Sequence, residues 1–304
     1  MLSWVSSRLD PRDHFMPRTV HLLALVAALS SAGATIFVRR GLRGSNSMTA
    51  LWVNVVVGTL GLWIAVLATG GVGHVSAVGI AFFVLAGLIG TIGGRLLRFV
   101  AIEQVGASIA AALTNLNPLV STGLAIVVLG ERVTAPIAAG TLVIVAGTIL
   151  LSTGGHRLGV EPARLVVPIL SATCFGVVAI LRKLGLSQMS AVLGSAINVT
   201  TALVGFTAFL LASGQRHIMA CRGRSLAHFV AAGITENLGV FLNIVALSIG
   251  SVSIVAPLYG AAPIFVLLLS FFFLRGIETL SGWVIAGTLL IVLGIYLITA
   301  LAGR

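Results

Sequence analysis

The sequence of 304 residues contains very little charge. Charged side chains make up only 8% of the residues, whereas hydrophobic residues make up 58%, and the mean hydropathy is +1.16. Soluble domains are typically about 25% charged. The scarcity of charge therefore excludes an ordinary soluble globular protein and predicts a chain whose main surroundings are lipid.

Acidic residues are the scarcest charged type, with seven against eighteen basic residues, which gives a formal net charge of +11. Such an excess can indicate nucleic-acid binding. Here, however, the basic residues stand singly or in small groups in the breaks between apolar runs, as they do in the loops of membrane proteins. We therefore expect no nucleic-acid partner.

Only two cysteines are present, Cys174 and Cys221, and they form neither a CxxC pair nor a disulfide framework. The sequence also lacks a Ser/His/Asp set, a nucleotide-binding loop and a metal-spaced cluster. We therefore expect no catalytic residues, no metal and no cofactor. A membrane enzyme or receptor is the alternative from another functional class, and demonstrated turnover without transport would be needed to support it.

Long apolar runs dominate the rest of the sequence. A bilayer core about 30 Å thick needs about 20 apolar residues per helix. The first run follows a polar tail, and we read it as a retained helix rather than a signal peptide. The runs cover residues 20–38, 48–69, 77–102, 107–129, 136–153, 163–181, 189–212, 226–248, 252–274 and 280–301.

The second half of the sequence repeats the first. Residues 140–147 return as residues 287–294 with six of eight positions identical. Further pairs follow at similar offsets, and we expect the two asparagines among them to hydrogen-bond between helices. These pairs are Asn54 with Asn198, Gly94 with Gly239, Ser108 with Ser253, Pro118 with Pro263, and Glu131 with Glu278.

Because each half contains five predicted spans, an odd number, the second half must enter the membrane with opposite polarity. The expected fold is an all-α integral membrane protein of about ten transmembrane helices, built as two inverted five-helix repeats around a central cavity. This design is common among secondary transporters. The boundaries are a polar tail at 1–19, a first repeat at 20–153, a linker at 154–162 and a second repeat at 163–302.

The motifs of both halves resemble the EamA module of the drug/metabolite transporter superfamily. The resemblance implies a ten-helix bundle that works by alternating access, with its cavity lined by the first, third, fourth, sixth, eighth and ninth spans. The fifth and tenth spans would be scaffolding, and their paired glycines would allow close packing. The motifs are Ala101, Ala107-Ser108, Asn117-Pro118, Leu129-Gly130-Glu131, Gly140 and Gly147, and then Ala246, Ser253, Pro263, Glu278, Gly287 and Gly294.

Glu236 lies about midway along the eighth run and is the carboxylate predicted to lie deepest in the membrane. Ionisable groups at this depth are costly and usually face protein or a water-filled space. Glu236 could be a structural group that is paired with an arginine or held neutral. Alternatively, it lines the cavity, where it binds a cationic group or exchanges a proton. We favour the second interpretation and take Glu236 as the candidate for proton coupling.

Arg95 and Arg98 lie three residues apart on one face of the third run, together with Thr91. The repeat offset of 145 maps this face onto that of Glu236 and Asn243, so all five are candidate substrate-binding residues. Two guanidiniums suit a carboxylate or phosphate through paired hydrogen bonds. The expected substrate is therefore anionic or zwitterionic. Alternatively, the arginine side chains extend to the membrane surface.

Pro118 and Pro263 interrupt the fourth and ninth runs, where a proline frees the carbonyl oxygen four residues earlier. Freed carbonyls at membrane depth are tolerated where they line a cavity or find another partner. Asn115, Asn117 and Tyr259 lie near these prolines and are further substrate-binding candidates. The alternative is that the prolines only bend their helices.

The leading hypothesis is a secondary transporter, and specifically an exporter, of a small polar metabolite in the cytoplasmic (inner) membrane. Its partners are a small-molecule substrate and the lipid bilayer, and a homodimer is left open. The alternatives are a flippase for a lipid-linked molecule and an exporter of cationic drugs.

The charge count and the resemblance favour opposite orientations in the membrane. With the N-terminus inside, seven basic residues lie inside and eleven outside, so this count favours the opposite orientation. The resemblance implies cytoplasmic termini, which we adopt.

Overall fold

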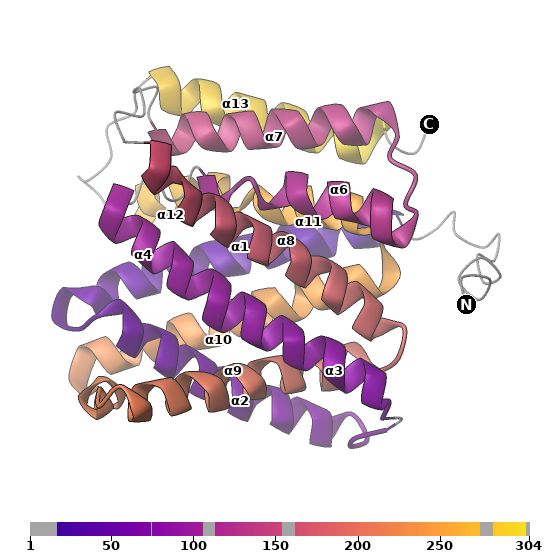
Figure 1. Ribbon diagram of the computed structural model, residues 1–304. Helices are drawn as coiled ribbons and strands as arrows, with labels where there is room; N and C mark the ends of the chain where they lie inside the picture. Colours follow the sequence, from indigo (N-terminus) through magenta and orange to yellow (C-terminus); the bar gives the residue numbers. More distant parts are fainter. Residues whose placement is uncertain (1–16, 74, 106–112, 154–161, 274–281, 302–304) are drawn as a thin grey trace.

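The computed structural model describes residues 17–73, 75–105, 113–153, 162–273 and 282–301, and these form a bundle of helices without strands (Figure 1). An all-α architecture is therefore confirmed. Some predictions lie outside the described residues: the polar tail to residue 16, the linker at 154–161, Ala107, Ser108 and Glu278.

The first half contains the following elements: α1 (Pro17–Gly41), η2 (Leu42–Gly44), α2 (Ser47–Ala68), α3 (Ala77–Ala86), η3 (Gly87–Gly94), α4 (Arg95–Val105), α6 (Asn117–Leu129) and α7 (Ala135–Thr153). The second half contains η4 (Pro162–Leu165), α8 (Val166–Leu186), α9 (Ala191–Ala212), η5 (Arg216–Met219), α10 (Gly223–Ile249), α11 (Val252–Gly260), α12 (Ala262–Phe273), α13 (Gly282–Tyr296) and η6 (Leu297–Leu301).

Within the described residues, six helices are long and apolar enough to cross a membrane by length and composition. They are Arg18–Gly44, Ser47–Ala68, Ala77–Arg98, Ala163–Leu186, Ala191–Ala212 and Gly223–Ile249. Four shorter apolar helices accompany them: Asn117–Leu129, Ala135–Leu150, Val252–Val266 and Ile285–Ala300. All ten segments overlap the predicted runs, and the six long ones alone make this a multi-pass membrane protein.

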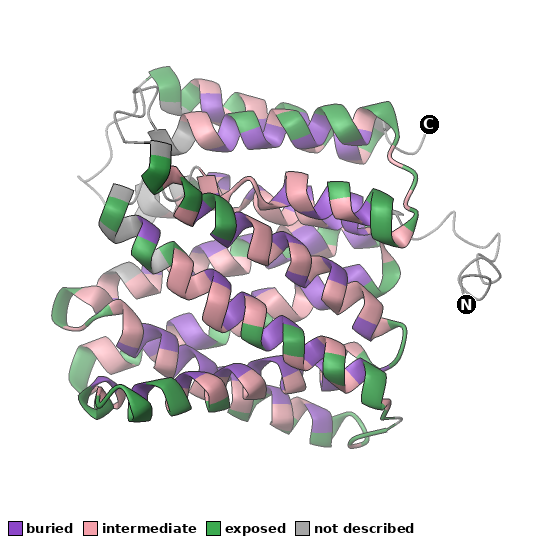
Figure 2. Ribbon diagram, viewed as in Figure 1, coloured by how far each residue is buried: buried purple, intermediate pink, exposed green. Residues whose placement is uncertain are grey.

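The outer surface of the bundle is apolar. Exposed residues lie on the outward helix faces and at the ends of the helices, while buried residues face the neighbouring helices (Figure 2). Among the exposed side chains are large hydrophobic ones such as Val127, Leu67 and Ile64. Large hydrophobic side chains exposed in this way are unfavourable in water and suit contact with lipid tails.

Helices of the two halves are interleaved. The first helix of the first half, α1, packs mainly against α10 and α12 of the second half. The first helix of the second half, α8, packs against α3, η3, α4 and α6 of the first half. Equivalent helices also contact each other, namely α2 with α9 and α7 with α13. Each half therefore buries its first helix in the other half, so the two halves form one bundle.

The pairs of equivalent helices run antiparallel. Between α7 and α13, Gly140 faces Gly294 and Gly147 faces Gly287. Between α2 and α9, the indole N–H of Trp52 donates to Thr207, and that of Trp63 donates to Thr200. The predicted close packing of the glycines is thus present, with α7 and α13 side by side at one edge of the bundle (Figure 1).

Adding a methyl group at this glycine contact should destabilise the bundle. A Cβ at Gly147 would lie 2.7 Å from the Gly287 carbonyl oxygen, so α7 and α13 must separate in a Gly147→Ala variant. Overpacking of this kind costs about 1–3 kcal/mol. We expect a lower unfolding temperature in detergent. Gly123→Ala is the matched control, because a Cβ at Gly123 meets nothing within 4 Å. Equal unfolding temperatures for the two variants would contradict this packing.

Two features differ from the predicted runs. The third run was expected to be a regular helix, but its middle, η3, is a π-helix of eight residues directly before Arg95. The sixth run was expected to end at residue 181, but α8 continues to Leu186 and includes Arg182 and Lys183. These two charges do not end the helix, because both side chains find polar partners within the bundle.

Candidate functional site

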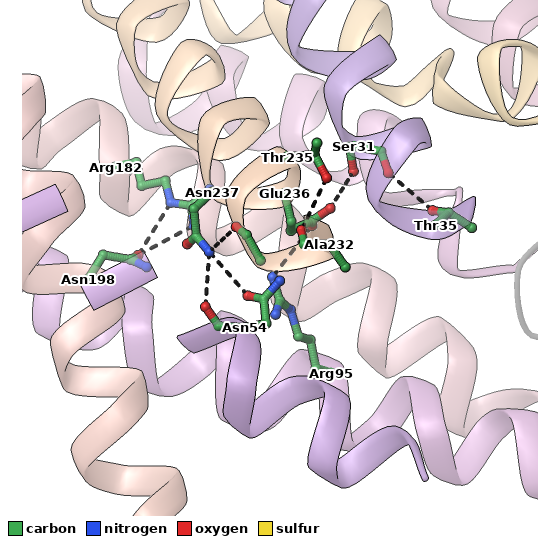
Figure 3. A network of polar contacts seen from close by, with 11 residues as sticks. Ser31, Thr35, Asn54, Arg95, Arg182, Asn198, Ala232, Thr235, Glu236 and Asn237 are labelled. Atoms are coloured by element: carbon green, nitrogen blue, oxygen red, sulfur yellow. Dashed lines mark hydrogen bonds and ion pairs between the residues drawn. The ribbon is translucent and has the colours of Figure 1, made fainter. Parts of the chain in front are cut away.

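The centre of the candidate site is an ion pair between two helices. Arg95 begins α4 directly after the π-helix, and its Nη2 lies 3.6 Å from Oε1 of Glu236 on α10. The side chains remain 23% and 21% exposed, respectively. Figure 3 shows the two side chains pointing toward one another. Neither side chain is therefore fully buried by the surrounding helices.

A π-helix precedes Arg95 and packs closely against α8. The stretch Gly87–Gly94 contains four glycines, and Gly94 lies close enough to α8 that an added Cβ would be 3.1 Å from the Phe175 ring. Short π-helical stretches occur often at functional sites. Ser171 on α8 donates to the Gly94 carbonyl oxygen over 2.8 Å. This close contact holds the start of α4 against α8.

Glu236 has a second partner on the first helix. The Ser31 hydroxyl donates to Oε2 of Glu236 over 3.0 Å, so both carboxylate oxygens have a polar neighbour. One turn further along α1, the Thr35 hydroxyl donates to the Ser31 carbonyl oxygen. The sequence prediction missed Ser31 because a serine within an apolar run is common and gives no signal of its own.

Two further predicted residues lie beside this pair. Arg98 is exposed, yet it lies near enough to Glu236, Arg95 and Tyr259 to interact electrostatically with each of them. Tyr259 on α11 is half-buried, and it interacts electrostatically with Glu236 and Arg95.

Arg182 joins the same group from α8. Its Nε and Nη2 each donate to Asn198 Oδ1 over 3.4 Å, and it interacts electrostatically with Tyr259 and Arg95. The sequence prediction counted Arg182 as a loop charge, since it follows the end of the sixth apolar run. Its equivalence to Arg39 in the repeat was visible but carried no indication of depth. Below, Ser31, Arg95, Arg98, Arg182, Glu236 and Tyr259 are called the polar cluster.

The residue after Glu236 fixes the position of α10 against α2. Asn237 Nδ2 donates to the Asn54 carbonyl oxygen over 3.0 Å and to that of Gly233 over 2.7 Å. Gly58 on α2 is packed against the Asn237 side chain. Asn54 and Asn198 are buried, and both accept hydrogen bonds from other helices. The two asparagines therefore have the interhelical role that the sequence suggested.

Other predicted site residues make no contact with the cluster among the interactions of the described residues. Thr91 and Asn243 are both buried, Thr91 within the π-helix and Asn243 two turns beyond Glu236. Asn115 lies in a turn before α6. Asn117 Nδ2 donates to the Thr114 carbonyl oxygen over 3.1 Å, so the carbonyl four residues before Pro118 has a partner.

Pro118 and Pro263 both follow a break in their helices. Pro118 stands in the first turn of α6, and Pro263 in that of α12 directly after α11 ends at Gly260. The two breaks meet, because a Cβ at Gly260 would lie 2.8 Å from Pro118. This contact between the two broken helices is next to Tyr259, which is a member of the polar cluster.

The corner between α10 and α11 is held by two charged side chains. Glu131 accepts from the backbone N–H groups of Val252 and Ser253 over 2.8 and 2.9 Å. Lys183 Nζ donates to the carbonyl oxygens of Leu247 and Gly250 over 2.6 Å each. Negative charge at a helix start and positive charge at a helix end are both stabilising. Glu131 therefore has a structural place at a turn, as the sequence suggested.

Removing the Glu131 carboxylate should loosen this corner. In Glu131→Ala, two N–H groups at the start of α11 lose their acceptor, and loss of a helix cap typically costs about 0.5–2 kcal/mol. We expect a lower unfolding temperature of the purified protein. The adjacent Arg132→Ala is the control, since Arg132 is exposed. If Glu131→Ala unfolds at the same temperature as Arg132→Ala, the cap contributes little to stability.

The described residues offer no group of three or more His, Cys, Asp and Glu side chains that could hold a metal ion. A cavity of about 320 Å³ lies between the end of α2 and the start of α9, where its lining includes Val66, Gly71 and Met189. None of the polar-cluster residues lines it, and its lining carries no charge. This cavity is therefore separate from the candidate site.

Comparisons with known proteins give matches over nearly the whole chain. A crystal structure of a protein that is 20% identical in sequence superposes with a TM-score of 0.77, covering 94% of this chain and 98% of the other. At this identity the match shows the fold alone. A comparison with curated proteins found no match. The model of the EamA-like transporter family matches twice, at residues 18–153 and 164–300. The chain therefore belongs to the EamA-like transporter family.

Proposed function

We propose that this protein is a secondary transporter that exports a small polar metabolite with an anionic or zwitterionic group. The polar cluster is the proposed substrate site. The observation that carries this proposal is the partly exposed ion pair of Arg95 and Glu236 within a multi-pass membrane protein, with Arg98 and Arg182 among its electrostatic neighbours. Charged side chains inside a membrane are costly, so their accessible positions favour a binding role.

We also propose that the two halves are inverted repeats that work by alternating access around the cluster. The antiparallel pairing of α7 with α13 supports this arrangement, since the two helices are equivalent in the repeat. The cluster draws on α1, α4, α8, α10 and α11, which come from both halves. A movement of one half against the other would therefore expose the cluster on either side in turn.

The direction and coupling of transport belong to the same proposal. The termini are cytoplasmic, the membrane is the cytoplasmic one, and Glu236 is the group that exchanges a proton if transport is proton-coupled. The pairing of Glu236 with Arg95 supports a role in charge balance within the empty site.

Counterflow in proteoliposomes tests the proposal. Vesicles that contain the purified protein are preloaded with an unlabelled amino acid, organophosphorus compound or cationic drug in parallel, and the same solute is added outside in labelled form. We expect accumulation of an anionic or zwitterionic solute above that in empty vesicles. Accumulation of cationic drugs alone would reject the proposed substrate class. A surface-charge variant, Arg216→Gln, is the control, because Arg216 is exposed in η5.

A further inference from the structure

Three exposed arginines lie at one end of the bundle. Arg43 lies in η2, Arg222 directly precedes α10, and Arg224 lies in the first turn of α10. Their guanidiniums form no ion pair or hydrogen bond with any residue that the structure describes. The connection between α1 and α2 lies beside the start of α10 (Figure 1). Below, Arg43, Arg222 and Arg224 are called the basic patch.

Close packing between η2 and α10 brings the patch together. A Cβ at Gly44 would lie 3.0 Å from the hydroxyl oxygen of Ser225, so the residue after Arg43 lies against the residue after Arg224. One turn further along α10, Phe229 is fully buried and packs against the end of α1. The backbone that carries the arginines is therefore fixed, and binding at the patch requires little ordering of the chain.

The charge of the patch is not balanced by nearby acidic side chains. Among the described side chains, no carboxylate lies on η2, on η5 or on the first three turns of α10. Glu236 is the nearest acidic residue along α10, and it follows Arg224 by about 18 Å of helix. Glu103 lies on α4, which packs against α8, η3 and η4. The described side chains therefore leave the positive charges of the patch uncompensated.

Arg224 begins the lipid-facing side of α10. Ala227, Ile234 and Leu238 follow it at helical spacing on the same face, and all three are exposed. The rise from Arg224 to Ile234 is about 15 Å, which is half of a bilayer core of about 30 Å. Arg224 therefore lies at the level of the lipid headgroups when Ile234 lies near the middle of the membrane.

We infer that the basic patch binds the headgroup of an anionic phospholipid, whose acyl chains lie along the exposed face of α10. Guanidiniums match phosphate oxygens with paired hydrogen bonds. Clustered basic residues beside a transmembrane helix attract anionic lipids. A water-soluble anion fits less well, because the face next to the arginines is apolar and suits acyl chains.

Thermal unfolding of the full-length protein in a non-ionic detergent measures this binding. Phosphatidylglycerol and phosphatidylcholine with identical acyl chains are added to the delipidated protein. Both lipids contain a phosphate, but only phosphatidylglycerol has a net charge. A ligand that binds the folded state raises the unfolding temperature.

Phosphatidylglycerol is expected to act at a lower concentration than phosphatidylcholine. Each arginine near a charged membrane surface contributes roughly fivefold in affinity, so the difference should be roughly tenfold or more. About 1 M salt should remove this difference, because it shortens the screening length to about 3 Å.

Substitutions separate a defined site from general surface charge. Arg224→Gln should weaken phosphatidylglycerol binding roughly fivefold, and neutralising all three arginines should remove the preference over phosphatidylcholine. Arg224→Lys keeps the charge and should keep most of the preference. Arg216→Gln is the matched control, because it makes the same change of charge on η5, which packs against α2 and α9. Without lipid, all variants should unfold at the same temperature, since these side chains are exposed.

Equal stabilisation by the two lipids would overturn the inference. An Arg216→Gln variant that loses as much as Arg224→Gln would overturn it too, since the charge would then act without a defined site. Stabilisation by inorganic phosphate to the same extent as by phosphatidylglycerol would reject a lipid in favour of a soluble anion. None of these measurements depends on transport, so the inference and the proposed function can fail separately.

Discussion

Arg95→Ala is expected to lower counterflow of the anionic substrate roughly hundredfold or more in kcat/KM. The variant removes a guanidinium whose charge-assisted hydrogen bonds are worth about 1.5–3 kcal/mol. It also leaves Glu236 without its ion-pair partner, so its carboxylate repels the incoming anion. Since each 1.4 kcal/mol is a factor of about ten, the two effects together exceed a hundredfold.

A stability measurement distinguishes this loss from misfolding. The double variant Arg95→Gln with Glu236→Gln removes both charges and keeps similar side-chain volumes, so it should unfold at nearly the temperature of the unmodified protein. Its transport should nevertheless remain low, because the guanidinium is absent. Counterflow at the normal rate in a folded Arg95→Ala protein would remove Arg95 from the substrate site.

Glu236→Gln is expected to lower both KM and kcat. Without the carboxylate, the cluster gains one further uncompensated positive charge, so an anionic substrate should bind roughly tenfold more tightly. Tighter binding retains the substrate in the site, so kcat should fall by a similar factor. Initial rates of counterflow over a range of substrate concentrations measure both quantities.

The same variant tests the proposed proton coupling. If Glu236 carries the coupled proton, transport by the glutamine variant should lose its dependence on pH. An unchanged pH profile would remove Glu236 from that role. Ser31→Ala is the matched control, since it removes the hydroxyl that donates to Glu236 and leaves the carboxylate in place.

Apolar runs were enough to predict where the helices lie in the sequence. Lipid imposes length and composition on each span, so the runs and the described helices overlap throughout. The glycine pairs were predictable for a similar reason. Gly140 and Gly147 recur with their equivalents at the same spacing, and close backbone contact tolerates only small residues.

The site was only partly predictable, because its remaining members depend on three-dimensional packing. Arg182 lies beyond the end of an apolar run, and only its contact with Asn198 and its position near Tyr259 place it in the bundle. Ser31 became relevant only through α1 packing against α10. The π-helix before Arg95 has a glycine-rich sequence, but glycines also allow close packing in ordinary helices, so composition alone could not indicate it.

Accessibility of Ser31→Cys from each side of sealed vesicles tests the central claim most directly. Cys174 and Cys221 are first replaced, since both are free and half-buried. Impermeant anionic and cationic thiol reagents of equal size are then applied outside or inside. Alternating access to a positively charged site predicts labelling from both sides, faster with the anionic reagent and slowed by substrate. Labelling from neither side, or from one side only, would contradict the account.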